Sequence, residues 1–146
     1  MMEFPSMIRY GRFATLSLLL GAVLALSGSA ASQTRPAAGA PPQMTVYKSP
    51  TCGCCSKWVE HMKANGFNVT ALDVEDIEVP KRTYNVPSSL ASCHTGIVGG
   101  YVVEGHVPAD VVSRMLREKP AIMGIAVPGM PVGSPGMEVP GHKDAY

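Results

Sequence analysis

The hydrophobic and polar positions along the first half of the chain change period twice and predict two strands with a helix between them. Residues 44–47 alternate and carry β-branched and aromatic side chains, which predicts a strand ending at the break over residues 49–51. From Ser56 onward the apolar positions recur at three and four residues, as in a helix, and Gly66 is a natural stop. Residues 67–73 alternate again and predict a second strand. A strand–helix–strand unit of this length favours parallel pairing.

The second half of the chain predicts a short helix, a hairpin and a final helix. Residues 79–84 can form a short helix begun by Pro80. Two apolar segments separated by Gly99-Gly100 indicate a hairpin, and residues 108–118 carry an apolar stripe at helical spacing. The order β-α-β-(α)-β-β-α, with a Cys-x-x-Cys pair between the first strand and the first helix, predicts an α/β fold of the thioredoxin-like plan. We therefore expect a small mixed sheet flanked by helices.

Residues 1–31 have the pattern of a secretory signal peptide. Arg9 and Arg12 precede an apolar run over residues 16–26, and residues 29–31 are small, as cleavage requires. The apolar run is shorter than the roughly 20 residues that span a bilayer, although an uncleaved N-terminal anchor would look similar. The sequence thus predicts export.

The rest of the chain is expected to hold one small folded domain. Residues 32–43 are rich in Pro, Ala and Gly and predict a flexible linker, residues 44–120 form the predicted thioredoxin-like domain, and residues 121–146 form a tail rich in Met, Pro and Gly. The chain carries 12 Lys and Arg against 11 Asp and Glu side chains, so no net field favours nucleic acid or anionic lipid. We expect no nucleic-acid partner and, after cleavage of the signal, no membrane contact.

The four cysteines are the main candidates for chemistry. Cys52, Cys54 and Cys55 lie at the predicted start of the first helix, and Cys93 is followed directly by His94. Thiolates bind Cu(I) and zinc and attack disulfides, and an adjacent imidazole adds a ligand or a base. A helix N-terminus stabilises a thiolate through its unpaired N–H groups and its dipole. The sequence therefore predicts one soft-metal or redox site.

The sequence allows several arrangements of the cysteines. A disulfide between Cys52 and Cys55 could be structural, but such a bond stabilises most when it closes a long loop, and this one closes almost none. Cys54 is surplus for disulfide exchange, yet a third thiol can bridge soft metal ions. The topology could bring Cys93 and His94 beside Cys52. The alternative is a disulfide between Cys93 and Cys54, with His94 an ordinary loop residue.

The remaining histidines and the tail methionines give weaker signals. We expect His106 to be a loop or packing residue and His61 to face solvent. In the tail, Met130 and Met137 each follow a Pro-Gly turn, which exposes the next side chain, and thioethers suit Cu(I). One hypothesis is that the tail folds over the cysteines and supplies one or two methionine ligands or shields the metal from water. The other is a mobile tail on the edge of the sheet.

Four groups of residues between Val46 and Met137 are together more specific than any one motif. They are residues 47–55 (YKSPTCGCC), residues 86–95 (VPSSLASCHT), residues 104–108 (EGHVP), and the pair of segments 126–131 (AVPGMP) and 133–137 (GSPGM). With them, the chain resembles the CopG-like family of exported copper-associated proteins, long catalogued as a domain of unknown function. The resemblance implies a periplasmic thioredoxin-like protein that binds copper through its cysteines in copper resistance. Redox chemistry at the site is proposed for that family. Copper ions are the expected partner, and other periplasmic copper-handling proteins are a further candidate.

The expected function is copper binding. Cys52, Cys54, Cys55 and Cys93 would hold Cu(I), with more than one ion where thiolates bridge, and His94 would complete the shell. The alternative is a periplasmic thiol–disulfide oxidoreductase in which Cys52 attacks and Cys55 resolves the mixed disulfide. A combined function, in which the dithiol changes the oxidation state of copper, is also open. Structural zinc is not favoured because the second ligand group lacks the usual knuckle spacing, and no phosphate-binding or hydrolase motif occurs.

Overall fold

The computed structural model describes residues 39–146. The predicted signal peptide, residues 1–31, and the first part of the predicted linker, residues 32–38, lie outside the described residues. Within residues 39–146, no helix is long and apolar enough to cross a membrane.

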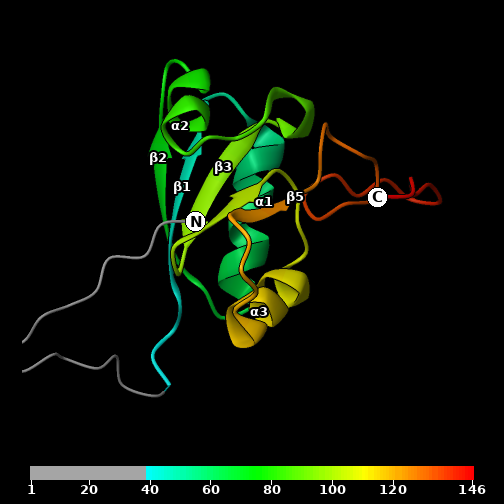
Figure 1. Cartoon of the computed structure of the whole chain (residues 1–146). Coiled ribbons are helices and arrows are strands. Elements are labelled where there is room, and N and C mark those ends of the chain that lie inside the picture. Colours follow the sequence, from blue (N-terminus) through cyan, green and yellow to red (C-terminus); the bar gives the residue numbers. More distant parts are fainter. Residues whose placement is uncertain (1–38) are drawn as a thin grey trace, which may run out of the picture. The chain divides into compact units, whose positions relative to one another are not determined.

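A five-stranded mixed sheet forms the centre of the domain (Figure 1). Its strands are β1 (Gln43–Lys48), β2 (Asn68–Asp73), β3 (His94–Val98), β4 (Tyr101–Glu104) and β5 (Gly124–Ala126), in the spatial order β2-β1-β3-β4-β5. The pairs β1–β2 and β4–β5 are parallel, whereas β1–β3 and β3–β4 are antiparallel. The predicted parallel unit and the predicted hairpin are both confirmed. The sequence pattern did not predict β5, which comes from the segment assigned to the tail.

Three α-helices and one short 3₁₀ turn connect these strands. The helices are α1 (Gly53–Ala64), α2 (Glu78–Thr83) and α3 (Ala109–Glu118), and the turn is η1 (Ser88–Leu90). The fold class predicted from the sequence is confirmed: an α/β domain with a small mixed sheet flanked by helices, followed by a Pro/Gly/Met-rich tail. In Figure 1, α1 lies behind the sheet, and the tail leaves β5 as the orange-to-red segment.

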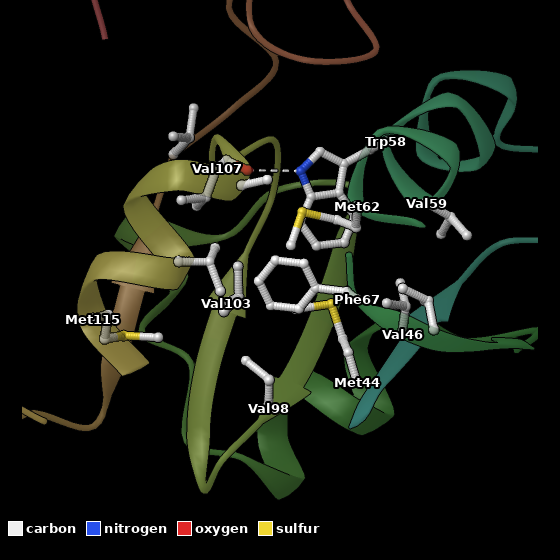
Figure 2. Close-up of a cluster of buried hydrophobic side chains, with 14 residues drawn as sticks. Met44, Val46, Trp58, Val59, Met62, Phe67, Val98, Val103, Val107 and Met115 are labelled. Carbon is white, nitrogen blue, oxygen red and sulfur yellow. Dashed lines mark hydrogen bonds between the residues drawn. The ribbon is translucent and has the colours of Figure 1, made fainter. Parts of the chain in front are cut away.

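The hydrophobic core lies between the sheet and the two longer helices (Figure 2). The apolar stripe of α1 supplies Trp58, Val59 and Met62, all buried, and the sheet supplies residues such as Val46 and Val103. Trp58 is fully buried, and its Nε1–H donates a 2.9 Å hydrogen bond to the carbonyl of Val107, drawn as the dashed line in Figure 2. This bond ties α1 to the segment that enters α3.

Candidate metal centre

The start of α1 places three cysteines on one tight turn. Cys52 is the N-cap residue, with extended backbone angles, and its Sγ accepts a 3.3 Å hydrogen bond from the N–H of Cys55. Cys52 and Cys55 are joined by a disulfide, and Cys54 Sγ lies 3.5 Å from Cys52 Sγ. The helix N-terminus therefore faces the sulfurs with its unpaired N–H groups, as the sequence predicted.

The sheet brings the second cysteine group to the same place. Lys48, at the end of β1, pairs in register with His94, the first residue of β3, so Cys93 arrives beside the turn that follows β1. The Sγ atoms of the four cysteines all lie within 4.8 Å of one another (Cys52, Cys54, Cys55 and Cys93). The topology thus unites the residues that the sequence predicted to form one site.

The described cysteines are in mixed oxidation states. Cys54 and Cys93 are free thiols, so the disulfide between them that the sequence left open is not formed. The sulfurs of the Cys52–Cys55 disulfide are not thiolates, and thiolates are the form that binds metal. A four-sulfur site therefore requires prior reduction of that disulfide, whereas Cys54 and Cys93 are available in either state.

Cys93 also belongs to a second group of potential ligands, formed with two histidines. Its Sγ lies 3.3 Å from His94 Nδ1 and 3.0 Å from His106 Nε2, and the three residues offer ligand atoms within 4.8 Å of one another. The sequence predicted that His106 would be a loop or packing residue. It does follow β4 in a loop and is fully buried, with its ring 5.0 Å from that of His94, and its Nε2 in addition faces the site thiol. Cys93 is shared by the sulfur group and the histidine group, which makes it the central residue of the site.

The tail fixes the tautomer of His106. His106 Nδ1 lies 2.8 Å from the carbonyl oxygen of Pro135, and a carbonyl only accepts, so Nδ1 carries the proton of the neutral ring. Nε2 then presents its lone pair toward Cys93. A carbonyl that orients an imidazole in this way is the usual support of a metal-binding histidine.

Burial keeps both histidines neutral. His94 is fully buried, and desolvation, with smaller contributions from His106 and Lys81, lowers its pKa to about 3. Burial also lowers the pKa of His106. His94 Nε2 has no hydrogen-bond partner although it is buried, which leaves one polar atom free beside the site. Neutral imidazole is the form that binds metals.

Burial also keeps the Cys93 thiol neutral, which for a thiol means that its pKa is raised. Desolvation, together with the neighbouring Cys54, raises the pKa of Cys93 to about 11. In the metal-free protein Cys93 therefore stays protonated near neutral pH. A metal ion that binds there must displace the proton, so binding at this residue is coupled to proton release.

A buried ion pair supports the loop that carries Cys93. Lys81 of α2 and Glu104 of β4 are almost completely buried, and Lys81 Nζ lies 2.5 Å from Glu104 Oε1. Glu104 also accepts a 2.6 Å hydrogen bond from the N–H of Ser92 and a 2.7 Å bond from the hydroxyl of Thr95. These contacts hold the residues on both sides of Cys93-His94. The sequence did not single out either charge.

The tail folds over this site. Gly136 approaches the start of α1 so closely that a Cβ there would lie 2.8 Å from Cys54 O and 2.9 Å from Trp58 N. Met137 is half-buried and follows Gly136 directly, whereas Met130 is 53% exposed. Of the two hypotheses for the tail, folding over the cysteines is the one that the structure supports. A methionine ligand remains a prediction.

His61 is not the solvent-facing residue that the sequence indicated. It is half-buried, and its Nε2 accepts a 3.2 Å hydrogen bond from the N–H of Ala109, at the start of α3. The histidine thus caps a helix, a role that depends on where α3 packs and leaves no trace in the spacing of α1.

Together, the mixed sheet and the cluster of thiols and imidazoles define a small α/β protein with a candidate soft-metal or redox centre. Residues 90–137 match a family model described as "Protein of unknown function, DUF411". Two solved structures titled "Copper resistance protein copG", Form 2 and Form 1, are each 48% identical to this chain and cover 71% of it, with TM-scores of 0.68 and 0.67. The alignments cover 83% and 82% of those chains, and no curated protein matches. The chain therefore belongs to the CopG-like copper resistance family.

Proposed function

We propose that this protein is an exported, periplasmic copper-binding protein of copper resistance. The observation that carries the proposal is the convergence of four cysteine Sγ atoms to within 4.8 Å of one another at a helix N-terminus. The family of the chain supports it, because the similar solved structures are titled copper resistance proteins. The N-terminal signal pattern supports export.

The ligand set favours Cu(I) over harder ions. In the reduced protein Cys52, Cys54, Cys55 and Cys93 would supply thiolates, and His94 would add a neutral imidazole. Soft thiolates select Cu(I), and sulfurs this close together can bridge more than one ion. His106 joins this set because its Nε2 lone pair faces Cys93.

The tail methionines would extend the site outward. Ser92 and Gly129 form an isolated parallel bridge, and each is followed directly in the sequence by a sulfur-bearing residue, Cys93 and Met130 respectively. Met130 is largely exposed and Met137 is half-buried. Thioethers bind Cu(I) but are poor ligands for zinc or calcium. We assign both methionines to the copper site as outer ligands.

Copper redox chemistry is compatible with the observed oxidation states. Two Cu(II) ions and the reduced Cys52/Cys55 dithiol would give two Cu(I) ions, the Cys52–Cys55 disulfide and two protons. The electrons come from the two thiols, so no further reductant enters the step. Cys54, Cys93 and the two histidines are not consumed and would retain the Cu(I) ions that form.

A thiol–disulfide oxidoreductase is the second candidate. The disulfide between Cys52 and Cys55, with Cys52 at the N-cap of α1, is the arrangement that such enzymes use. This function would use Cys52 as nucleophile and Cys55 as resolving thiol. It leaves Cys54, Cys93 and the two buried histidines without a role, and for this reason we favour copper binding.

An anaerobic Cu(I) titration of the reduced protein, without its signal segment and against a competing chelator, tests the proposal. Copper and free thiols should be counted on the same sample. Binding of more than one copper per chain, with all four thiols protected, is the expected result. No competitive binding, together with rapid pairing of two thiols, would favour the oxidoreductase instead.

A further inference from the structure

The tail segment over residues 128–138, here named the strap, crosses the cysteine site. We propose that the strap is a size filter, which admits metal ions and small thiols to the cysteines and excludes the thiols and disulfides of other folded proteins. The inference rests on the proposed function, because it specifies the class of substrate for that same site.

The strap occupies the backbone edge beside Cys93. The N–H of Gly129 donates a 3.3 Å hydrogen bond to the carbonyl of Ala91, and Ser92 bonds through its hydroxyl to the carbonyl of Gly129. Ser92 and Gly129 also form a parallel β-bridge. An extended peptide docks on another protein through free backbone groups of this kind. Here the groups beside the site thiol are already paired with the chain's own tail.

The strap makes a second set of contacts, with the start of α1 and with His106. The Pro135 carbonyl accepts a hydrogen bond from His106, and Gly136 packs against Cys54 O and Trp58 N with no space for a Cβ. The N–H of Gly136 donates a 2.9 Å hydrogen bond to Glu138 Oε1, and Ser134 is fully buried. The strap is thus held across the site by two separate sets of contacts. One set lies beside Cys93, and the other lies at the start of α1.

The remaining exposure of the cysteines suits a small ligand. Cys52, Cys54 and Cys93 are half-buried, and Cys55 is fully buried. Disulfide exchange passes through a covalent mixed disulfide, so a partner sulfur must reach one of these atoms and bring its own backbone with it. A metal ion brings no backbone. The strap therefore admits a metal ion or a small thiol and excludes a sulfur atom that is attached to a folded protein.

Gly136→Ala tests the filter, with Gly141→Ala as its matched control. Both glycines have positive φ, +85° and +76°, so alanine strains the backbone at each, but a Cβ at position 141 meets nothing within 4 Å. Reduced, metal-free protein is treated with N-ethylmaleimide or with a maleimide on a long polyethylene glycol chain. The rate with the large reagent is divided by the rate with N-ethylmaleimide. This access ratio is then divided by the access ratio of the same protein in denaturant. Insulin disulfide reduction in the presence of dithiothreitol is the second readout.

In the wild type and in Gly141→Ala, we expect slow reaction with the large reagent and no acceleration of insulin reduction. Gly136→Ala should raise the relative rate of the large reagent by about tenfold, which corresponds to ~1.4 kcal/mol less work to open the strap. Glu138→Ala, a surface change that removes the acceptor of Gly136 N–H, should move the ratio in the same direction and decides the matter if Gly136→Ala does not fold.

A wild-type ratio equal to that in denaturant, or insulin reduction by the wild type, would overturn the filter. So would a ratio that is unchanged in the folded variants Gly136→Ala and Glu138→Ala. The access ratio is measured without copper, so it stands or falls independently of the copper titration. A failed titration with an intact ratio would remove the proposed function and leave the strap as a barrier to protein partners.

Discussion

His106 Nε2 lies 3.0 Å from Cys93 Sγ, although the two residues are 13 positions apart in the chain. The contact depends on the β3–β4 hairpin, which brings the chain back to the end of the sheet where β3 begins. It also depends on Pro135, whose carbonyl accepts a hydrogen bond from His106 Nδ1. The carbonyl of Pro135, a residue of the strap, therefore orients His106 with its Nε2 toward Cys93, which links the tail to the candidate site.

Replacing His106 with Gln should weaken copper binding without unfolding the protein. The change removes the imidazole lone pair that faces Cys93. We expect the Cu(I) affinity to fall by about tenfold or more, since loss of a group that only orients a metal ligand already costs roughly tenfold or more. The measurement is chelator competition on the reduced protein.

His142→Gln is the control for that experiment, because His142 is an exposed histidine of the same tail. Equal affinity in His106→Gln and the wild type would remove His106 from the ligand set. A matching loss in His142→Gln would point to a general effect of the tail instead.

Cys54→Ser should separate copper binding from disulfide exchange. Cys54 lies outside the Cys52–Cys55 disulfide, so that pair can still open and close in the variant. The number of copper ions bound per chain should fall because a bridging sulfur is lost. Copper content and the reduction potential of the remaining disulfide can be measured on the same preparation. An unchanged copper capacity would exclude a bridging role for Cys54.

The stability of the protein should fall in acid because of His94. The pKa of His94 is about 3 in the folded protein, well below the ordinary value of 6.5. Between pH 6.5 and pH 3 the unfolded chain therefore binds a proton at His94 that the folded chain does not bind. The free energy of unfolding that this residue contributes above pH 6.5 is lost as the pH falls toward 3. Near pH 5 the loss from this residue should be about 2 kcal/mol.

Urea unfolding at several pH values, on wild type and His94→Gln, measures this contribution. The variant has no titrating group at position 94, so its free energy of unfolding should fall less steeply in acid, whatever its absolute stability. Parallel curves for the two proteins would show that His94 is not held neutral by burial.

Removing only one partner of the buried Lys81–Glu104 pair should lower the free energy of unfolding strongly. Lys81→Met leaves the Glu104 carboxylate buried without its cation, and such losses amount to ~3–5 kcal/mol. The free energy of unfolding in urea is the readout. Adding Glu104→Gln to Lys81→Met should restore part of the stability, because the unpaired charge is then removed.

Lys48→Met is the matched control for Lys81→Met. Lys48 also pairs with a carboxylate, but the side chain of its partner, Asp73, is 57% exposed. Water can solvate that carboxylate, so the loss should stay within about 1 kcal/mol. Similar losses for Lys48→Met and Lys81→Met would contradict the assignment of the buried pair as the support of the Cys93 loop.

The predictable part of the site is set by local patterns and by topology. The alternation in β1 and the helical spacing of α1 place Cys52, Cys54 and Cys55 at a helix N-terminus whatever the rest of the chain does. Antiparallel pairing of β1 with β3 then brings Cys93-His94 to the same end of the sheet. The first step needs only the period of the pattern. For the second, the order of the elements indicated that Cys93-His94 could lie beside Cys52, and the antiparallel pairing itself is given by the structure.

The unpredicted part depends on contacts between segments without periodicity. His106 sits in a Gly-containing turn, and its orientation is set by a carbonyl 29 residues further on. Lys81 looks like an exposed helix lysine until Glu104 is placed beneath it. A three-residue strand such as β5 is too short to show alternation. Each of these features exists only once the tertiary fold has formed.

Copper K-edge X-ray absorption on the reduced, copper-loaded protein tests the central claim most directly. Thiolate ligation of Cu(I) by the converging cysteines predicts an edge characteristic of Cu(I) and a first shell dominated by sulfur, with a minor nitrogen contribution from the histidines. A first shell of nitrogen and oxygen, or copper that washes off without displacing thiol protons, would contradict the assignment of the four cysteines as the copper site.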